Sequence, residues 1–112
     1  MHRGLILLGL ALVLNGAITV ELPPLIEAAK ARDWAGVEGL LEKGTDPNEV
    51  APDGATALHW ASYWDEVEAA SALLEAGADV NAANDLGATA LFNASLNGSV
   101  QMVRTLLDAG AN

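Results

Sequence analysis

Apolar and polar positions follow two different patterns along the chain, and the patterns meet near residue 20. Residues 5–14, LILLGLALVL, form a continuous apolar run without a polar stripe. From Glu21 onward, apolar residues instead recur at helical spacing among acidic and polar ones. This second pattern predicts short amphipathic helices. The two segments therefore belong to different parts of the protein.

The first segment has the layout of a secretory signal peptide. A positive start at Arg3 precedes the apolar run, and small residues follow it. A membrane-spanning helix needs about 20 apolar residues, whereas Asn15 interrupts this run early. A helix of the folded core would carry a polar stripe. We predict a signal peptide over residues 1–19, cleaved near 17–19, with an uncleaved anchor or a core helix as alternatives.

The rest of the chain repeats itself with a period of 33 residues. Three copies are expected at about 20–50, 51–83 and 84–112. The matching pairs include Gly54 with Gly87, Thr56 with Thr89, Leu58 with Leu91, Ala61 with Ala94, and Gly77 with Gly110. A period of this length is typical of a solenoid, whose repeats bury their apolar faces by stacking.

The middle copy shows how each unit is expected to fold. Asp53–Gly54 predicts a turn, and Thr56 is expected to cap a short helix through its hydroxyl. Asp65–Glu66 are expected to open a second helix, where negative charge is favourable. Gly77 supplies the left-handed residue that ends it. Because neither helix can bury its apolar side alone, the copies must stack as an all-α solenoid.

Two stretches of the second copy resemble the ankyrin repeat. GATALHWAS at 54–62 and LLEAGADVNA at 73–82 are similar to the family wording G-x-TPLH-x-AA and LLL-x-x-GADVNA. The resemblance covers about residues 25–112 and implies about three stacked helix-turn-helix repeats that bind another protein. The first copy is expected to cap the stack. The third is expected to be truncated, as in the N-terminal part of a longer array, unless the array naturally stops at three repeats.

The resemblance also assigns structural roles. The glycine that separates the two helices is Gly98 in the third copy, but Asp65 and Arg32 stand there in the others. His59 is expected to hydrogen-bond Thr56 rather than act chemically. The residues of the structural motif are Thr56, Leu58, His59, Ala61, Gly77, Thr89, Leu91, Ala94 and Gly110.

Composition narrows the function classes. The chain has 15 acidic and 5 basic residues, and this negative charge disfavours nucleic acid and anionic membranes as partners. Without cysteine there is no thiol nucleophile and no Cys-ligated zinc. The acidic residues near Asp65 do not match a calcium loop and are expected to be solvated. We therefore predict a protein that is not an enzyme and needs no metal or cofactor.

The aromatic residues are the sharpest candidates for a binding role. Trp60, Tyr63 and Trp64 fall within five residues, and aromatics are enriched in interface hot spots. Trp60 is expected to pack between repeats, and the alternative is that all three are packing residues. The residues predicted to line the concave, partner-binding face are Tyr63, Trp64, Pro52, Asp53, Asp85, Leu86, Leu96 and Asn97.

The function expected from the sequence is therefore an exported, periplasmic or secreted, protein-interaction module. Its acidic surface predicts a partner protein with a basic or neutral contact surface, and a single copy is expected to act as a monomer. The alternative is the N-terminal recognition domain of a longer secreted enzyme or effector, whose chemistry lies beyond Asn112.

Overall fold

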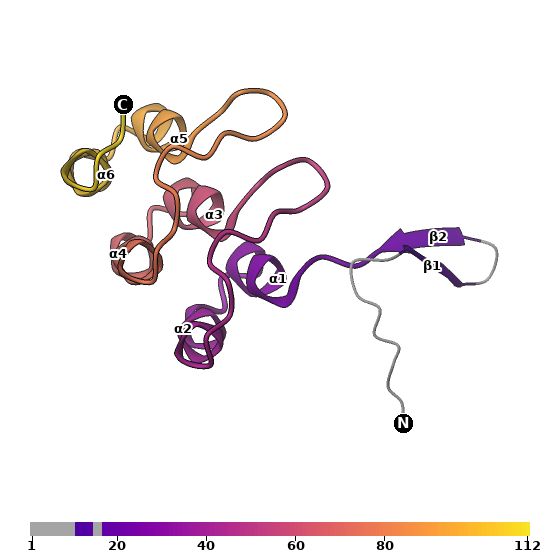
Figure 1. Ribbon diagram of the computed structural model, residues 1–112. Helices are drawn as coiled ribbons and strands as arrows, with labels where there is room; N and C mark the ends of the chain where they lie inside the picture. The colour runs from indigo at the N-terminus through magenta and orange to yellow at the C-terminus, as the bar shows by residue number, and fades with distance from the viewer. Residues whose placement is uncertain (1–10, 15–16) are drawn as a thin grey trace.

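The computed structural model describes residues 11–14 and 17–112. Most of the predicted signal peptide's apolar run, at residues 5–14, therefore lies outside the described residues. The described part contains a two-stranded hairpin followed by six helices (Figure 1). The elements are β1 (Ala11–Leu14), β2 (Ala17–Val20), α1 (Pro24–Lys30), α2 (Trp34–Glu42), α3 (Ala57–Tyr63), α4 (Val67–Glu75), α5 (Ala90–Asn97) and α6 (Val100–Asp108).

The hairpin stands beside α1, outside the helical stack (Figure 1). Its strands pair antiparallel, with Ala11 opposite Val20 and Leu14 opposite Ala17. The described residues of this segment are therefore extended, and neither helical alternative considered for the segment is seen in them. No helix in the described ranges has the length and apolar character that crossing a membrane requires. Export and cleavage stay predictions.

The six helices form two layers and confirm the predicted all-α solenoid of three helix-turn-helix repeats. Helices α1, α3 and α5 lie side by side, and α2, α4 and α6 form a second layer next to them, on the left in Figure 1. Fully buried side chains, such as Leu25 of α1 and Leu73 of α4, fill the space between the layers. Two long loops, here called the fingers, project from the first layer at residues 51–55 and 84–88.

The turn between the two helices of each repeat uses one left-handed residue. Arg32, Asp65 and Gly98 have φ angles of 64°, 58° and 69°. In the second turn the next backbone N–H, that of Glu66, donates to the Ala61 carbonyl at 2.8 Å, which closes the end of α3. The sequence position of this residue was predicted correctly. Helix α4 begins only at Val67, however, so Asp65 and Glu66 precede it instead of opening it.

The predicted helix ends are confirmed. The Thr56 and Thr89 hydroxyls accept from the third backbone N–H of their helices, at 3.3 and 3.2 Å. Gly77 and Gly110 follow the second helices of their repeats with φ angles of 103° and 100°. The threonine hydroxyls satisfy amides that lack helical partners, and the glycines reverse the chain without the steric cost of a Cβ.

The apolar residues of the last helix lie on more than one side of it. Leu106 is fully buried and Val103 is half-buried, whereas Val100 and Leu107 are exposed. The reason is that α6 packs against α5 and α4, which lie on one side of it. Residues on its other side have no helix to cover them in the described part of the chain.

Candidate functional site

The two fingers hold each other in place through backbone contacts. Within the first, the Ala51 N–H donates to the Ala55 carbonyl at 2.9 Å. Between the fingers, the Asp85 N–H donates to the Asp53 carbonyl at 2.9 Å. Gly54 has a φ of 83°, and a Cβ there would lie 3.0 Å from an Asp85 side-chain oxygen. The close approach of the fingers therefore requires glycine at this position.

His59 joins the second repeat to the third. Its ring Nδ1 accepts from the Thr56 backbone N–H at 3.0 Å, so the ring hydrogen is on Nε2. This Nε2–H donates to the Ala88 carbonyl of the second finger at 2.8 Å. The predicted Thr56–His59 contact is confirmed, while the bond to the next repeat was missed by the sequence reasoning. His59 is a structural residue whose polar atoms are both engaged.

A ladder of asparagines joins successive repeats and was also missed. The Asn48 side chain donates to the Gly77 carbonyl at 3.0 Å and accepts from the Asp79 N–H at 2.7 Å. One period later, Asn81 makes the same pair of bonds with Gly110 and Asn112, at 3.3 and 2.9 Å. The signal was available in the sequence, since Asn48 and Asn81 are 33 residues apart.

The three aromatic residues at the end of α3 form one cluster. Trp60 and Tyr63 meet edge to face with centroids 5.5 Å apart, and Tyr63 and Trp64 do so at 4.9 Å. The Trp60 and Trp64 rings are stacked at 6.4 Å. Trp60 packs against the core, as predicted, but Tyr63 is 54% exposed. The cluster therefore presents a rigid aromatic surface to solvent.

Two of the few cations in this acidic protein lie against the same cluster. The Arg32 guanidinium carbon is 4.6 Å from the Trp64 ring centroid, and Lys30 Nζ is 5.9 Å from that of Trp60. These distances are within reach of cation–π attraction. The Trp64 indole N–H is buried without a hydrogen-bond partner among the described residues. Two basic side chains therefore lie against the rings of the aromatic cluster.

A small groove separates α1 from the first finger. It has a volume of about 190 Å³, and its walls include Ile26 and Lys30 of α1, Pro52 of the finger, and Trp60 of α3. The groove thus connects the aromatic cluster with a finger tip. We call this surface, made by the finger side of α1, α3 and α5 together with the fingers, the inner face.

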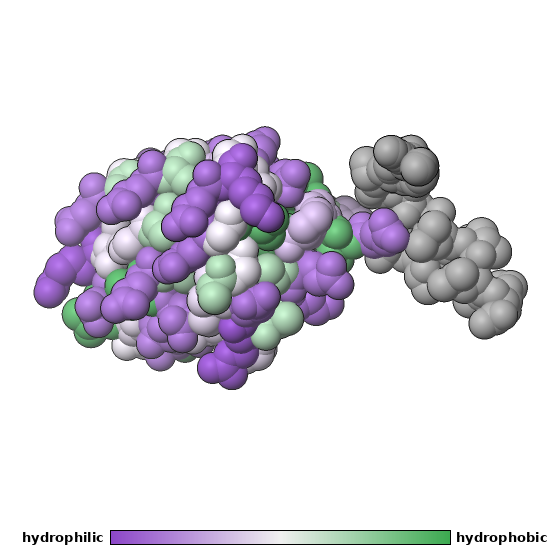
Figure 2. Space-filling view, turned by 90° about the horizontal axis from the view of Figure 1, so that it is seen from below, coloured by the Kyte–Doolittle hydropathy of each residue, from purple (hydrophilic) through white to green (hydrophobic). Residues whose placement is uncertain are grey.

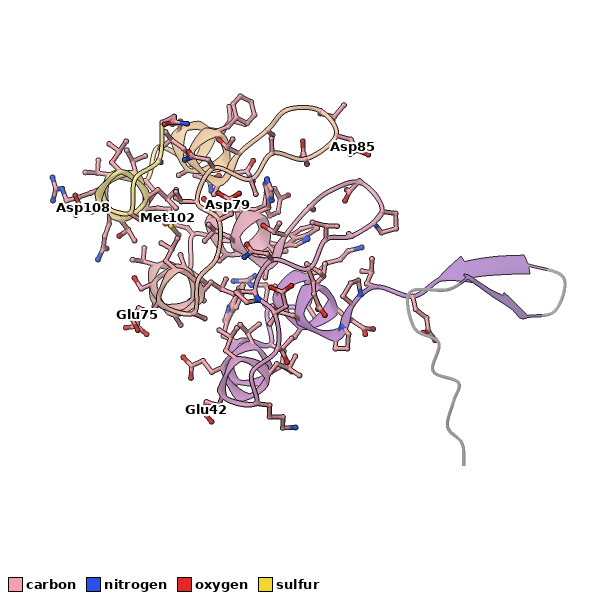
Figure 3. The ribbon with its side chains drawn as sticks, viewed as in Figure 1. Glu42, Glu75, Asp79, Asp85, Met102 and Asp108 are labelled. Atoms are coloured by element: carbon pink, nitrogen blue, oxygen red, sulfur yellow. The ribbon has the colours of Figure 1, made fainter. Side chains whose placement is uncertain are left out.

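The predicted partner-binding residues differ in how much of each side chain is exposed to solvent. Leu86 at the second finger tip is 94% exposed, and Leu96 of α5 is 72% exposed. Pro52, Asp53 and Asp85 are also exposed, and Asp85 lies on the projecting finger (Figure 3).

Asn97, also predicted to line that face, is engaged within the stack. Its side-chain amide donates to the carbonyls of Ser62 and Tyr63, both at 3.0 Å. Trp64 is half-buried beneath Arg32. Tyr63, Leu86 and Leu96 are therefore the apolar residues most available to a partner. No group of three or more potential metal ligands comes together in the part of the chain that the structure describes.

Comparisons with known proteins agree with this geometry. Residues 25–112 match the family model described as Ankyrin repeats (3 copies). The chain belongs to the ankyrin-repeat family. It is also similar to the solved human ASB11 ankyrin repeat domain, with 40% sequence identity and a TM-score of 0.75 over 80% of this chain. No curated protein matched the chain.

The match covers only 41% of that solved domain, so this chain spans less than half of its length. Ankyrin repeats are generally protein–protein interaction modules and typically lack enzymatic activity.

Proposed function

We propose that this ankyrin stack binds a partner protein through its inner face, with Tyr63 as the central contact. The observation that carries the proposal is the aromatic cluster, which leaves Tyr63 more than half exposed. Trp60 of the same cluster lines the groove beside Pro52. A rigid aromatic side chain contributes contact area at low entropic cost, which is why tyrosine and tryptophan dominate interface hot spots.

The charge of the surface defines the partner further. Residues 20–112 carry 15 acidic and four basic residues. The finger tips contribute Asp53 and Asp85, both exposed. A partner with a basic contact surface would be attracted by this field, and its association rate would fall as salt screens the charges. A neutral contact surface would be compatible with the acidic face but would show no such salt dependence.

The direct test starts with capture of the partner from an extracytoplasmic fraction, followed by binding measurements on the purified pair. Tyr63→Ala is expected to weaken binding by about tenfold or more. Phe92→Ala is the matched control because Phe92 is about equally exposed but makes none of the ring contacts of the cluster. Equal binding by Tyr63→Ala and the unaltered chain, with no salt dependence, would contradict the proposed face.

We also propose that the protein is exported and that its N-terminal segment is removed. The apolar run and the small residues that follow it support this. N-terminal sequencing of protein recovered outside the cytoplasm should begin near residues 17–19. Recovery of only the uncleaved chain from the cytoplasm would exclude export.

A further inference from the structure

The Asn97 side chain fastens the end of α5 to the end of α3. Its amide nitrogen donates to the carbonyls of Ser62 and Tyr63, both at 3.0 Å. Tyr63 is the last residue of α3, and the last carbonyls of a helix have no partner within that helix. The Asn97 amide supplies the missing donor from the next repeat. We call this pair of hydrogen bonds the α3–α5 latch.

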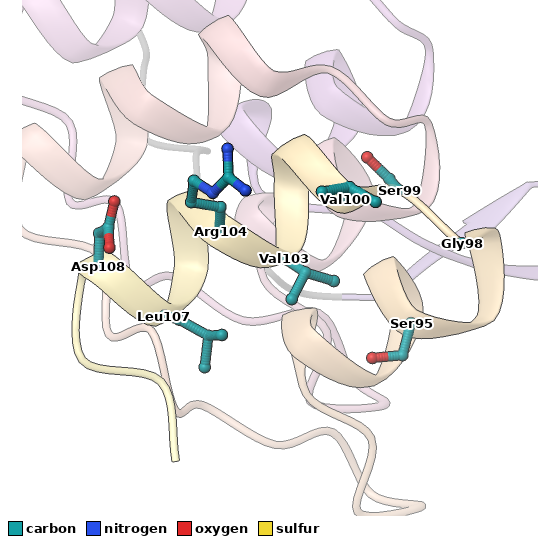
Figure 4. A pocket seen from close by; sticks show the side chains of 8 residues that line it. All are labelled: Ser95, Gly98, Ser99, Val100, Val103, Arg104, Leu107 and Asp108. Carbon is teal, nitrogen blue, oxygen red and sulfur yellow. The ribbon is translucent and has the colours of Figure 1, made fainter.

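The residue that follows the latch is a glycine. Gly98 lies in the turn between α5 and α6 (Figure 4), and both Asn97 and Gly98 are exposed to solvent. Gly98 carries no side chain, and glycine adopts more backbone conformations than any other residue. When this part of the backbone is free to move, the Gly98 nitrogen can therefore reach the side-chain carbon of Asn97 with little hindrance. A bond between these two atoms closes a five-membered ring.

A second asparagine of α5 provides a comparison within the same helix. The Asn93 side chain donates to the His59 carbonyl of α3 at 3.2 Å, so it also joins the two helices. The residue after it is Ala94, whose methyl group crowds the backbone nitrogen beside it. Asn93 and Asn97 therefore share a side chain and a neighbouring helix, and they differ in the residue that follows.

We propose that Asn97 is a modification site, at which attack by the Gly98 nitrogen leads to replacement of the latch amide by a carboxylate. A bond forms between the Gly98 nitrogen and Asn97 Cγ, and the bond from Cγ to Nδ2 breaks. Nδ2 leaves as ammonia, which takes up the proton of the Gly98 N–H. Water then opens the five-membered imide and leaves aspartate or isoaspartate at this position. Water is the only co-reactant.

The intact latch opposes this reaction. The Asn97 amide is held against α3, and the Gly98 N–H donates to the Ser95 carbonyl at 3.1 Å. Both reacting groups are therefore engaged while α5 is packed on α3. The reaction requires the end of α5 to separate from α3, and such local openings cost less free energy than global unfolding. Modification of Asn97 thus follows an opening between the second and third repeats.

The product cannot form the latch again. A carboxylate has no N–H to donate, and here it would face two carbonyl oxygens at the negative end of the α3 dipole. Residues 20–112 already carry 15 acidic and four basic residues, and hydrophilic side chains cover much of the face shown in Figure 2. A further negative charge increases the self-repulsion of such a chain. Modification therefore releases α5 from α3 irreversibly, whether or not the inner face binds a partner.

The test follows the conversion of each asparagine in the full chain by tandem mass spectrometry, at mildly alkaline pH, in native buffer and in urea. In urea, Asn97 should convert at least about tenfold faster than Asn93, and Gly98→Ala should remove this difference. In native buffer, Asn97 should convert at least about tenfold more slowly than in urea, because an opening must come first. His59→Phe breaks a separate contact between the same two repeats, so it should speed the conversion of Asn97 in native buffer.

Thermal unfolding of three variants measures the effect of the product. Asn97→Asp should lower Tm by about 4–8 °C or more, because two hydrogen bonds are replaced by repulsion. Ser95→Asp is the matched control, since it adds the same charge to the same helix at an exposed residue outside the latch, and it should lower Tm less. Asn97→Ala removes the two bonds without adding charge, so its Tm should lie above that of Asn97→Asp.

Three results would overturn the proposal. Equal conversion of Asn97 in native buffer and in urea would mean that the latch does not protect it. Equal conversion of Asn97 and Asn93 in urea would mean that Gly98 does not direct the attack. An Asn97→Asp variant as stable as Ser95→Asp would mean that the carboxylate does not release α5 from α3.

Discussion

The second and third repeats have equivalent residues in equivalent helices, yet they bury them differently. Leu74 of α4 packs against the core, while its equivalent Leu107 of α6 is half exposed. His59 has both ring nitrogens engaged, while Phe92 at the same position points outward. In a solenoid, the same sequence position stabilises the fold only when a neighbouring repeat covers it. The difference between the repeats therefore lies in their neighbours more than in their own sequences.

The largest change in stability is expected when a buried leucine and an exposed leucine are each replaced by alanine. Leu73→Ala leaves a cavity at a fully buried site and should lower the free energy of unfolding by about 2–5 kcal/mol. Leu107→Ala, from an exposed site, should cost about 1 kcal/mol or less. Urea denaturation at low protein concentration measures both. Equal losses would mean that Leu107 is covered in solution by something beyond its own repeat.

The next test exchanges the residues found at the histidine position. His59→Phe removes the bond to the Ala88 carbonyl, which still accepts from the Asn84 N–H, and leaves the buried Thr56 backbone N–H without its acceptor, at a cost of about 1–3 kcal/mol. The reciprocal Phe92→His places a polar ring in solvent and should change the unfolding free energy by less than about 0.5 kcal/mol. The order of the two midpoints in urea checks the prediction, and a larger loss for Phe92→His would contradict it.

The inter-helix turns allow a comparison of glycine with other residues at one backbone angle. A Cβ at Gly98 meets no neighbour within 4 Å, so Gly98→Ala should cost about 1–2 kcal/mol through the left-handed φ alone. Arg32→Gly should relieve a similar strain, offset by loss of the contact with Trp64, for a net gain below about 1 kcal/mol. Thermal unfolding of the two variants should move in opposite directions, and shifts of the same sign would refute the account.

The smallest effect is expected in the asparagine ladder. Asn48→Ala breaks two bonds between the first two repeats and should cost about 0.5–1.5 kcal/mol. Asn81→Ala breaks the equivalent bonds to Gly110 and Asn112, which are longer at 3.3 and 2.9 Å, so its cost should be smaller. Hydrogen exchange of the Asp79 amide reports the first bond directly. If the Asp79 amide were protected from exchange equally well in Asn48→Ala, the asparagine ladder would make no contribution to stability.

Much of the fold followed from the period alone. A repeat of 33 residues with threonine and glycine at fixed offsets located the helix caps at Thr56 and Thr89 and the stops at Gly77 and Gly110. The resemblance to the ankyrin repeat located the left-handed residues at Arg32 and Asp65, where neither residue type is the usual choice. The helix boundaries were predicted less well. Helix α4 starts at Val67 because Asp65 and Glu66 form the turn before it.

The candidate site was predicted only in part. The position of the aromatic residues in α3 marked the surface, but their spacing could not show that the rings pack on one another or that two cations lie on them. Asn97 was predicted to line the partner-binding face together with Leu96. Its side-chain amide instead donates to two backbone carbonyls at the end of α3. Such contacts join residues about one period apart, so their geometry depends on how closely the repeats approach.

The sequence by itself determined the repeat, the helix ends and the family, because these depend on local backbone chemistry and on a pattern that each copy restates. Only the tertiary structure decided which copies of a pattern are buried. Phe92, Val100 and Leu107 are equivalent to residues of the earlier repeats that are buried or partly buried, and they are exposed because burial depends on the neighbour that covers a side chain.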